Sequence, residues 1–162
     1  MIVRKAKLCD LKEITEIYNN AIENTVATFD TKTKSLEEQI KWFNNHGKRY
    51  PIIVAEKNGD IIGWSALSKY STKCAYADTV ELSLYVKNKH QGEGIGKILM
   101  KKIIKAGEKA GLHVILVRIT DGNKISIHLH EMFGFEHVGV LKEVGYKFGK
   151  CLDVYLMQKI LK

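Results

Sequence analysis

The sequence feature that most constrains the fold is a strand pattern, a glycine-rich turn and a helix pattern in direct succession. Residues 79–86 place an apolar side chain at every second position, which is typical of a strand with one buried face. Residues 95–110 have apolar side chains at helical spacing, and Gly111 follows where a left-handed C-cap belongs. The connecting segment contains His90-Gln91-Gly92-Glu93-Gly94-Ile95-Gly96-Lys97. Backbone N–H groups at such a helix start can hold an anion, so this turn favours a phosphate-bearing ligand.

The other segments predict an α/β fold with a mixed sheet. Apolar and β-branched runs predict strands at residues 52–57, 61–68, 113–120, 135–142 and 152–161. Helical spacing predicts helices at residues 10–24, behind Ser35 and at residues 125–133. Asp10 with Glu13, and Ser35 with Glu38, have the spacing of a capping box, and Asn58-Gly59-Asp60 predicts a tight hairpin turn. Hairpins dominate the middle and helices alternate with strands later, so helices should cover both faces.

Composition favours one globular domain spanning residues 1–162. The chain is 45% hydrophobic, which is enough for a sizeable core at this length. No apolar run approaches the ~20 residues of a spanning helix, and the N-terminus lacks a signal-peptide pattern. Cys9, Cys74 and Cys151 never form C-x-x-C, so neither a disulfide framework nor a zinc site is expected. We therefore expect a cytoplasmic protein that binds no metal and no membrane.

The net charge of +8 raises the alternative of a nucleic-acid-binding module. The basic residues are spread along the chain and form no block. Only Arg4, Arg49 and Arg118 are arginine, the residue that most often reads bases. The sequence therefore argues against a nucleic-acid partner.

Three kinds of phosphate-binding loop can be compared with the glycine-rich turn. A Walker A loop requires G-x-x-x-x-G-K-[ST], whereas the outer glycines here are one residue too close and Ile98 replaces the hydroxyl. A dinucleotide-binding loop requires G-x-G-x-x-G and an acidic residue on the next strand, which residues 113–120 lack. The third pattern, Q-x-x-G-x-G, is satisfied by Gln91, Gly94 and Gly96, and it resembles the pyrophosphate loop of GNAT-superfamily acetyltransferases. Taken alone, a tight strand-to-helix turn explains the glycines equally well.

Further motifs narrow this resemblance. They are Thr79-Val80-Glu81-Leu82-Ser83-Leu84-Tyr85-Val86, residues 126–135, Val144-Gly145-Tyr146-Lys147-Phe148-Gly149 and Arg49-Tyr50-Pro51. Over roughly residues 2–160 the chain resembles the phosphinothricin acetyltransferase subfamily of the GNAT superfamily. The resemblance implies a GNAT fold, with a mixed, mostly antiparallel central sheet of about six to seven strands and helices on both faces. It also implies acetyl-CoA as the acetyl donor, a small-molecule amine as acceptor, and a homodimer.

The resemblance places acetyl-CoA in a cleft where two neighbouring parallel strands, here residues 79–86 and 113–120, splay apart. The contacts that it implies are Leu84, Tyr85, Val86, Gln91, Gly92, Glu93, Gly94, Ile95, Gly96, Lys97, Asn123 and Ser126. From the residues alone, Asn123 is an equally good N-cap for the helix that includes Ile125. Both roles can hold together.

Acetyl transfer from a thioester requires a neutral amine. Amino groups have pKa values near or above ~8, so a base must remove a proton. Alternation puts Glu81 on the polar face of its strand, and the resemblance implies that Glu81 is the general base, acting directly or through a water. Without the resemblance, a salt-bridged or solvated glutamate is the simpler interpretation. Some relatives carry a histidine where this chain has Phe148, so a Glu–His dyad is not available through that position.

The resemblance also implies the class of acceptor, an α-amino acid or analogue of the phosphinothricin, methionine sulfone or methionine sulfoximine type. Its anionic group calls for a cation, and Lys73 and Lys147 are candidates beside Glu81, with Tyr76 as a pocket-lining candidate. Cys151 stands where close relatives often have tryptophan, which weakens any transfer of the substrate by analogy. Two alternatives remain open, an acetyltransferase of protein or peptide amines and a non-catalytic acyl-CoA sensor.

Overall fold

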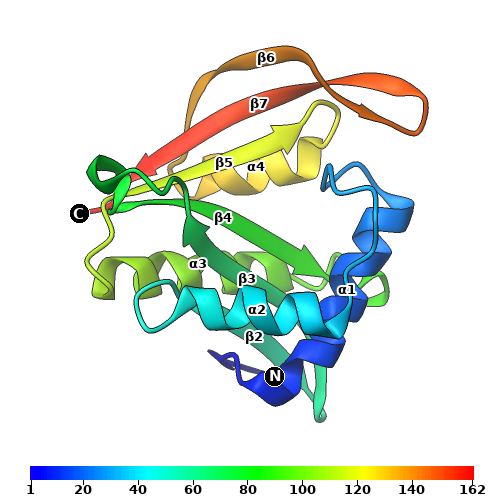
Figure 1. The fold of residues 1–162 in the computed structure, drawn as a ribbon, viewed down its shortest axis with the longest axis vertical. Helices are drawn as coiled ribbons and strands as arrows, with labels where there is room; N and C mark the ends of the chain where they lie inside the picture. The colour runs from blue at the N-terminus through cyan, green and yellow to red at the C-terminus, as the bar shows by residue number, and fades with distance from the viewer.

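The computed structural model describes residues 1–162, which form one seven-stranded sheet with helices on both of its faces (Figure 1). In chain order the elements are β1 (Ile2–Lys5), η1 (Leu8–Asp10), α1 (Leu11–Asn24), α2 (Leu36–His46), β2 (Ile52–Lys57), β3 (Asp60–Lys69), η2 (Cys74–Tyr76), β4 (Thr79–Val86), η3 (Asn88–His90), α3 (Ile95–Lys109), β5 (Val114–Thr120), α4 (Lys124–Met132), β6 (Glu136–Lys147) and β7 (Lys150–Ile160). No helix is both long and apolar enough to cross a bilayer.

The strand order is β1-β2-β3-β4-β5-β7-β6, and this confirms the predicted mixed sheet. All neighbouring strands pair antiparallel except β4 and β5, which are parallel. The parallel pair is short, because pairing covers only Thr79–Glu81 on β4 and Val114–Leu116 on β5. Beyond these residues the two strands separate, so the middle of the sheet is open at one end.

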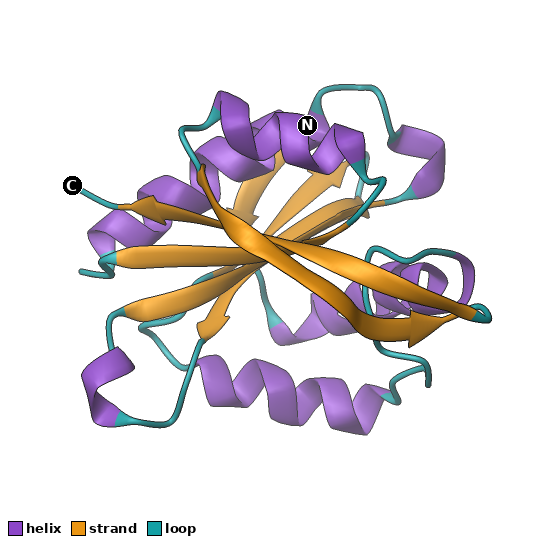
Figure 2. Ribbon diagram, turned by 90° about the horizontal axis from the view of Figure 1, so that it is seen from above, coloured by secondary structure: helices purple, strands orange, loops and turns teal.

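The two faces of the sheet are covered by different helices (Figure 2). On one face, α3 and α4 cover a core cluster of 18 buried residues that includes Leu99, Ile103 and Ile115. On the other face, α1 and α2 cover a cluster of 9 buried residues around Leu11, Ile14 and Trp64. Burial of each large apolar side chain contributes about 1.5–3 kcal/mol, so these clusters hold the helices against the strands.

Several local predictions can be compared with the backbone. Asn58 and Gly59 have φ values of 53° and 86°, which confirms the tight turn between β2 and β3. Ser35 accepts from the N–H of Glu38 and Glu38 accepts from that of Ser35, which confirms the second capping box. The first is wrong, because the Asp10 carboxylate accepts from Arg4 and from a backbone N–H before the helix.

Two strands differ from their predicted extents. The four-residue strand β1 was not predicted, since it is short and mostly solvent-accessible. Strand β6 continues to Lys147, beyond the predicted end at residue 142. The extension is irregular, with a register shift between Leu141 and Gly145 and a positive φ at Glu143. Most of this strand is exposed on both faces, so no alternation of buried side chains marks it in the sequence.

Candidate active site

The separation of β4 from β5 creates a cavity of about 850 Å³. Residues 82–86 of β4 and 117–120 of β5 line it, and these are the residues that follow the last parallel pair, Glu81 with Leu116. Residues 82–86 pair with β3 on one side only, so their other backbone edge faces an opening with no strand partner. An extended ligand with amide groups can pair with such an edge, as a peptide does in strand addition.

The glycine loop closes one end of this cavity. Gly92 and Gly94 have φ values of 82° and 80°, a left-handed conformation that glycine adopts without strain. Gly94 is the N-cap of α3, so the first N–H groups of this 15-residue helix are available to an anion. Lys89 and Lys97 add positive charge to the lining. The cavity therefore fits acetyl-CoA, whose phosphates suit the loop and whose pantetheine amides suit the open edge of β4.

The structure brings most of the predicted acetyl-CoA contacts to this cavity. The residues that line it are Leu84, Tyr85, Val86, Gln91, Gly92, Gly94, Ile95, Gly96, Lys97, Asn123 and Ser126. Glu93 is the exception, because its carboxylate pairs with His90 at 2.9 Å and with Lys57 at 3.1 Å. The hydrogen bond from His90, followed by that from Lys57, holds the pKa of the Glu93 carboxyl below its usual value.

Asn123 has the structural role that its sequence position also allowed. Its side chain accepts from the backbone N–H of Ser126 at 3.2 Å, so it caps α4. It lines the cavity as well. On the same helix, His130 is buried and its Nδ1 contacts the carbonyl of Ser126 at 2.7 Å. Burial lowers the pKa of His130, so we assign it a structural role.

Glu81 is the last paired residue of β4, and it is held by a neighbour that the sequence did not single out. Arg118, two residues beyond the β5 partner of Glu81, donates from Nε and Nη2 to the two carboxylate oxygens, each at 2.7 Å. The pair raises the pKa of Arg118. Residues two apart on a strand share a face, so a known β4–β5 register would have revealed the pair. Arg118 lines the cavity, whereas Glu81 is not among the lining residues and adjoins the cavity through this ion pair.

The predicted acceptor residues are placed outside the cavity lining. Lys73 is exposed, and Tyr76 packs edge-on against Tyr70 with 5.3 Å between ring centroids. Lys147 is buried and donates to the carbonyl of Thr28 at 2.8 Å. Burial lowers the pKa of Lys147. Lys147 thus supports the backbone of the segment between α1 and α2.

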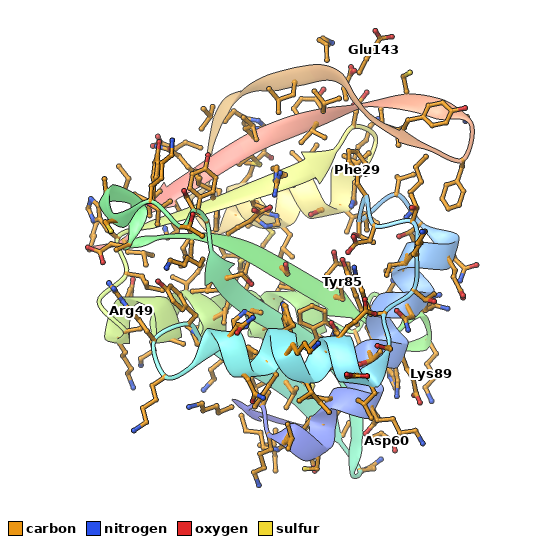
Figure 3. The ribbon with its side chains drawn as sticks, viewed as in Figure 1. Phe29, Arg49, Asp60, Tyr85, Lys89 and Glu143 are labelled. Carbon is orange, nitrogen blue, oxygen red and sulfur yellow. The ribbon has the colours of Figure 1, made fainter.

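That segment, residues 25–35, contributes Thr25 and Ala27 to the cavity lining, and contacts from distant parts of the chain hold it in place. Thr120 donates to the carbonyl of Val26 at 2.6 Å. The ring of Phe29, which Figure 3 labels, lies against Gly145 of β6. The Tyr18 hydroxyl donates to Asp30. Strand β5, helix α1 and the β6–β7 hairpin therefore all hold the segment in place.

The ring of Tyr85 extends from β4 into the aromatic cluster under this segment. Its ring centroid is 5.3 Å from that of Tyr18 and 5.0 Å from that of Trp64. Burial raises the pKa of Tyr85 to about 12, so its phenol is neutral at physiological pH. The backbone of Tyr85 therefore lines the cavity, while its ring packs in the core.

A cleft between splayed parallel strands, with a glycine turn at a helix N-terminus, is the arrangement expected of an acyl-CoA-dependent transferase. Residues 3–156 match the acetyltransferase (GNAT) domain family. The chain is 35% identical over 159 residues to the L-methionine sulfoximine/L-methionine sulfone acetyltransferase of Salmonella typhimurium, covering 98% of this chain and 93% of that protein.

Solved structures agree with this match. The phosphinothricin acetyltransferase of Sinorhizobium meliloti in complex with acetyl-CoA superposes with a TM-score of 0.94 and 34% identity, covering 99% of this chain and 88% of that one. The ribosomal-protein-alanine N-acetyltransferase of Brucella melitensis superposes with a TM-score of 0.96 and 37% identity, covering 99% and 100%. The chain therefore belongs to the GNAT acetyltransferase family. It is an N-acetyltransferase with acetyl-CoA as its acetyl donor.

Proposed function

We propose that this enzyme acetylates the α-amine of a small amino acid or analogue, of the phosphinothricin, methionine sulfone or methionine sulfoximine type, with Glu81 as general base. The observation that carries the proposal is the position of Glu81 at the fork where β4 and β5 separate. The cavity opens from this fork toward the glycine loop. The names of the Salmonella and Sinorhizobium relatives support the class of acceptor.

The reaction follows from these positions. The Glu81 carboxylate accepts a proton from the acceptor ammonium, directly or through a water, and leaves a neutral amine. The nitrogen then attacks the thioester carbonyl carbon, the C–N bond forms, and the C–S bond breaks. The sulfur leaves as the thiol after taking the second amine proton, so acetyl-CoA and amine become CoA and N-acetylamine. General-base action of this kind contributes roughly 10²–10⁴ in rate.

On the donor side, the backbone supplies most of the proposed contacts. Residues 84–86 would pair with the pantetheine amides, and residues 91–97 would hold the pyrophosphate with the helix N-terminus. Glu93 faces Lys57 and His90, so its proposed role is to hold the loop in shape. Lys73, Tyr76 and Lys147 lie outside the cavity lining, so the contribution that we propose for them on the acceptor side is indirect, with Lys147 holding the backbone at Thr28.

The test is an acetylation assay with acetyl-CoA and a panel of free amino acids that includes phosphinothricin, methionine sulfone and methionine sulfoximine. Mass spectrometry of N-acetyl products avoids the background from the three free cysteines. Product with one of these amino acids supports the proposal. Acetyl-CoA binding without product from any free amino acid would overturn it.

A second candidate is acetylation of a protein or peptide N-terminus. The similarity to the ribosomal-protein-alanine N-acetyltransferase of Brucella melitensis supports it, at a similar level of identity. A peptide panel in the same assay distinguishes the two candidates. A third outcome, cofactor binding with no product from either panel, would indicate a non-catalytic acyl-CoA sensor.

We also propose that the enzyme is a homodimer that works in the cytoplasm. Strand β6 is a sheet edge and exposes apolar side chains, with Val138, Val144 and Tyr146 at 56%, 56% and 71%. An exposed apolar edge strand is a pairing surface, and a second copy of the chain would cover it. The three unpaired cysteines suit a reducing compartment. Light scattering at several concentrations tests the dimer.

A further inference from the structure

The Arg118–Glu81 pair leaves one edge of the guanidinium without a protein partner. Nε and Nη2 each donate to Glu81, and no hydrogen bond joins Nη1 to any residue. A guanidinium has five N–H donors in a planar fork, so three remain free, and one on Nη1 and one on Nη2 form the open edge. The arginine side chain is 60% exposed and lines the cavity. This free edge is available to a ligand that lies next to the candidate base.

The other cations around the site are engaged or belong to other regions. Lys87 pairs with a glutamate of α1 at 3.2 Å. Lys89 and Lys97 flank the glycine loop, where phosphates are expected. Lys147 is buried and committed to the segment between α1 and α2, and Lys73 does not line the cavity. This leaves the arginine on β5 as the cation that adjoins both the cavity and Glu81.

We propose that Arg118 binds the α-carboxylate of the acceptor amino acid. The inference rests on the proposed function and deepens it by naming the group that selects the substrate. An α-amino acid carries its ammonium and its carboxylate on one carbon. A carboxylate bound to the Nη1 and Nη2 edge therefore brings the ammonium toward Glu81. The ion pair thus offers one partner to each charge of the zwitterion.

The same geometry gives a basis for specificity. Bidentate pairing of an arginine with a carboxylate is roughly twice as strong as a neutral hydrogen bond and is directional. In a peptide the corresponding carboxyl is a neutral amide, which cannot supply a negative charge to the free edge. Arg118 therefore favours free amino acids over peptide N-termini, and it separates the two candidate functions described above.

The test compares two acceptors that differ in one charge. L-methionine sulfone carries the carboxylate, and its carboxamide keeps the amine and the side chain but is neutral at that group. The enzymes are the wild type, Arg118→Gln, Arg118→Lys and the control Arg49→Gln. Arg49 is also an exposed, ion-paired arginine, but it does not line the cavity. If another amino acid from the panel is the better acceptor, that amino acid and its carboxamide replace this pair.

For the free amino acid, Arg118→Gln is expected to lower kcat/KM by about 30- to 100-fold, mostly through KM. For the carboxamide the loss is about 3-fold or less, which reflects the support of Glu81 alone. Arg118→Lys recovers part of the loss for the amino acid, because it restores the charge without the fork. Arg49→Gln leaves both substrates unchanged, and acetyl-CoA affinity stays constant in all variants.

Equal losses for the two substrates would overturn the inference and show that Arg118 acts only through Glu81, as a positioning residue. A wild type that acetylates the carboxamide as well as the amino acid would also overturn it, while the proposed base remains. Failure of the wild type with every free amino acid, with acetyl-CoA bound, would overturn the proposed function and this inference together. The outcomes are therefore distinguishable.

Discussion

The two halves of the site are assembled in different ways. The donor half consists of β4, the glycine loop and the start of α3, which follow one another within residues 79–97. The acceptor half that we propose consists of residues 25–35 and the β6–β7 hairpin, together with their contacts to β5. Two hydrogen bonds hold it together, from Lys147 to Thr28 and from Thr120 to Val26. Their partners are 119 and 94 positions apart in the chain. Local sequence patterns can therefore reveal the first kind of site. They cannot reveal the second kind, because folding brings its residues together from distant parts of the chain.

The largest effect is expected at the junction of the two halves. Glu81→Gln should lower kcat by about 10²–10⁴-fold, because the amide cannot accept the amine proton. Acetyl-CoA affinity, measured by calorimetry, should not change. Glu136→Gln, an exposed glutamate on β6, is the matched control. A wild-type kcat in the Glu81→Gln variant would show that Glu81 is not the general base.

A variant in the donor half should change only the binding of acetyl-CoA. Gly94→Ala places a Cβ at a φ of 80°, a conformation that costs an L-residue roughly 1–2 kcal/mol. We expect an increase of about 10-fold in the Kd for acetyl-CoA, with the KM for the acceptor unchanged. Gly111→Ala, at the other end of the same helix and at a φ of 72°, carries the same strain away from the cavity. Equal loss of affinity in both variants would mean that strain, and not the loop, is responsible.

Of the two substrates, a variant in the acceptor half should change the binding of the acceptor only. A Cβ on Gly145 would lie 2.1 Å from the ring of Phe29, so Gly145→Ala must displace this ring and its segment. We expect a loss of about 1–3 kcal/mol in stability and a several-fold increase in the KM for the acceptor. Gly139→Ala on the same strand meets no atom within 4 Å and is the control.

The double variant Gly145→Ala with Phe29→Ala separates steric displacement from other causes. Removal of the ring creates the space that the new methyl group needs, so the two changes should be less than additive. Unfolding by denaturant and the KM for the acceptor measure the coupling. Strict additivity would show that the contact between segment and hairpin does not control the acceptor half.

The smallest effect concerns pH and compares the helices over the two faces. Burial lowers the pKa of His46 at the end of α2 and of His130 in α4. Below about pH 6.5 the unfolded chain therefore binds protons that the folded chain does not, and stability falls as pH falls. We expect Tm to drop by a few degrees between pH 7.5 and 5.5. His46→Asn and His130→Asn should each reduce this drop, and an unchanged pH dependence in either variant would contradict its assignment.

The sequence predicted the strand, turn and helix around the glycine loop well, because their signals are local. Alternation located β4, the three glycines located the loop, and the positions of Asn58 and Ser35 located a turn and a helix start. The pair formed by Arg118 and Glu81 could not be predicted, since it depends on the register between two strands that are separated by a helix. The support that Lys147 gives to Thr28 was also missed, because it joins a strand to a loop 119 positions away in the chain. A buried cation and a solvated one look alike in sequence.

The separation of β4 from β5 also has a mechanical consequence. Three residue pairs connect the β1–β4 part of the sheet to the β5–β7 part, and beyond them the sheet has an edge inside the molecule. A ligand that pairs with this edge would supply the hydrogen bonds that a further strand would make, and it should therefore stiffen the link between the two parts. Release of the ligand loosens the same link. We therefore expect the centre of the sheet to be stiffer with a ligand bound than without one.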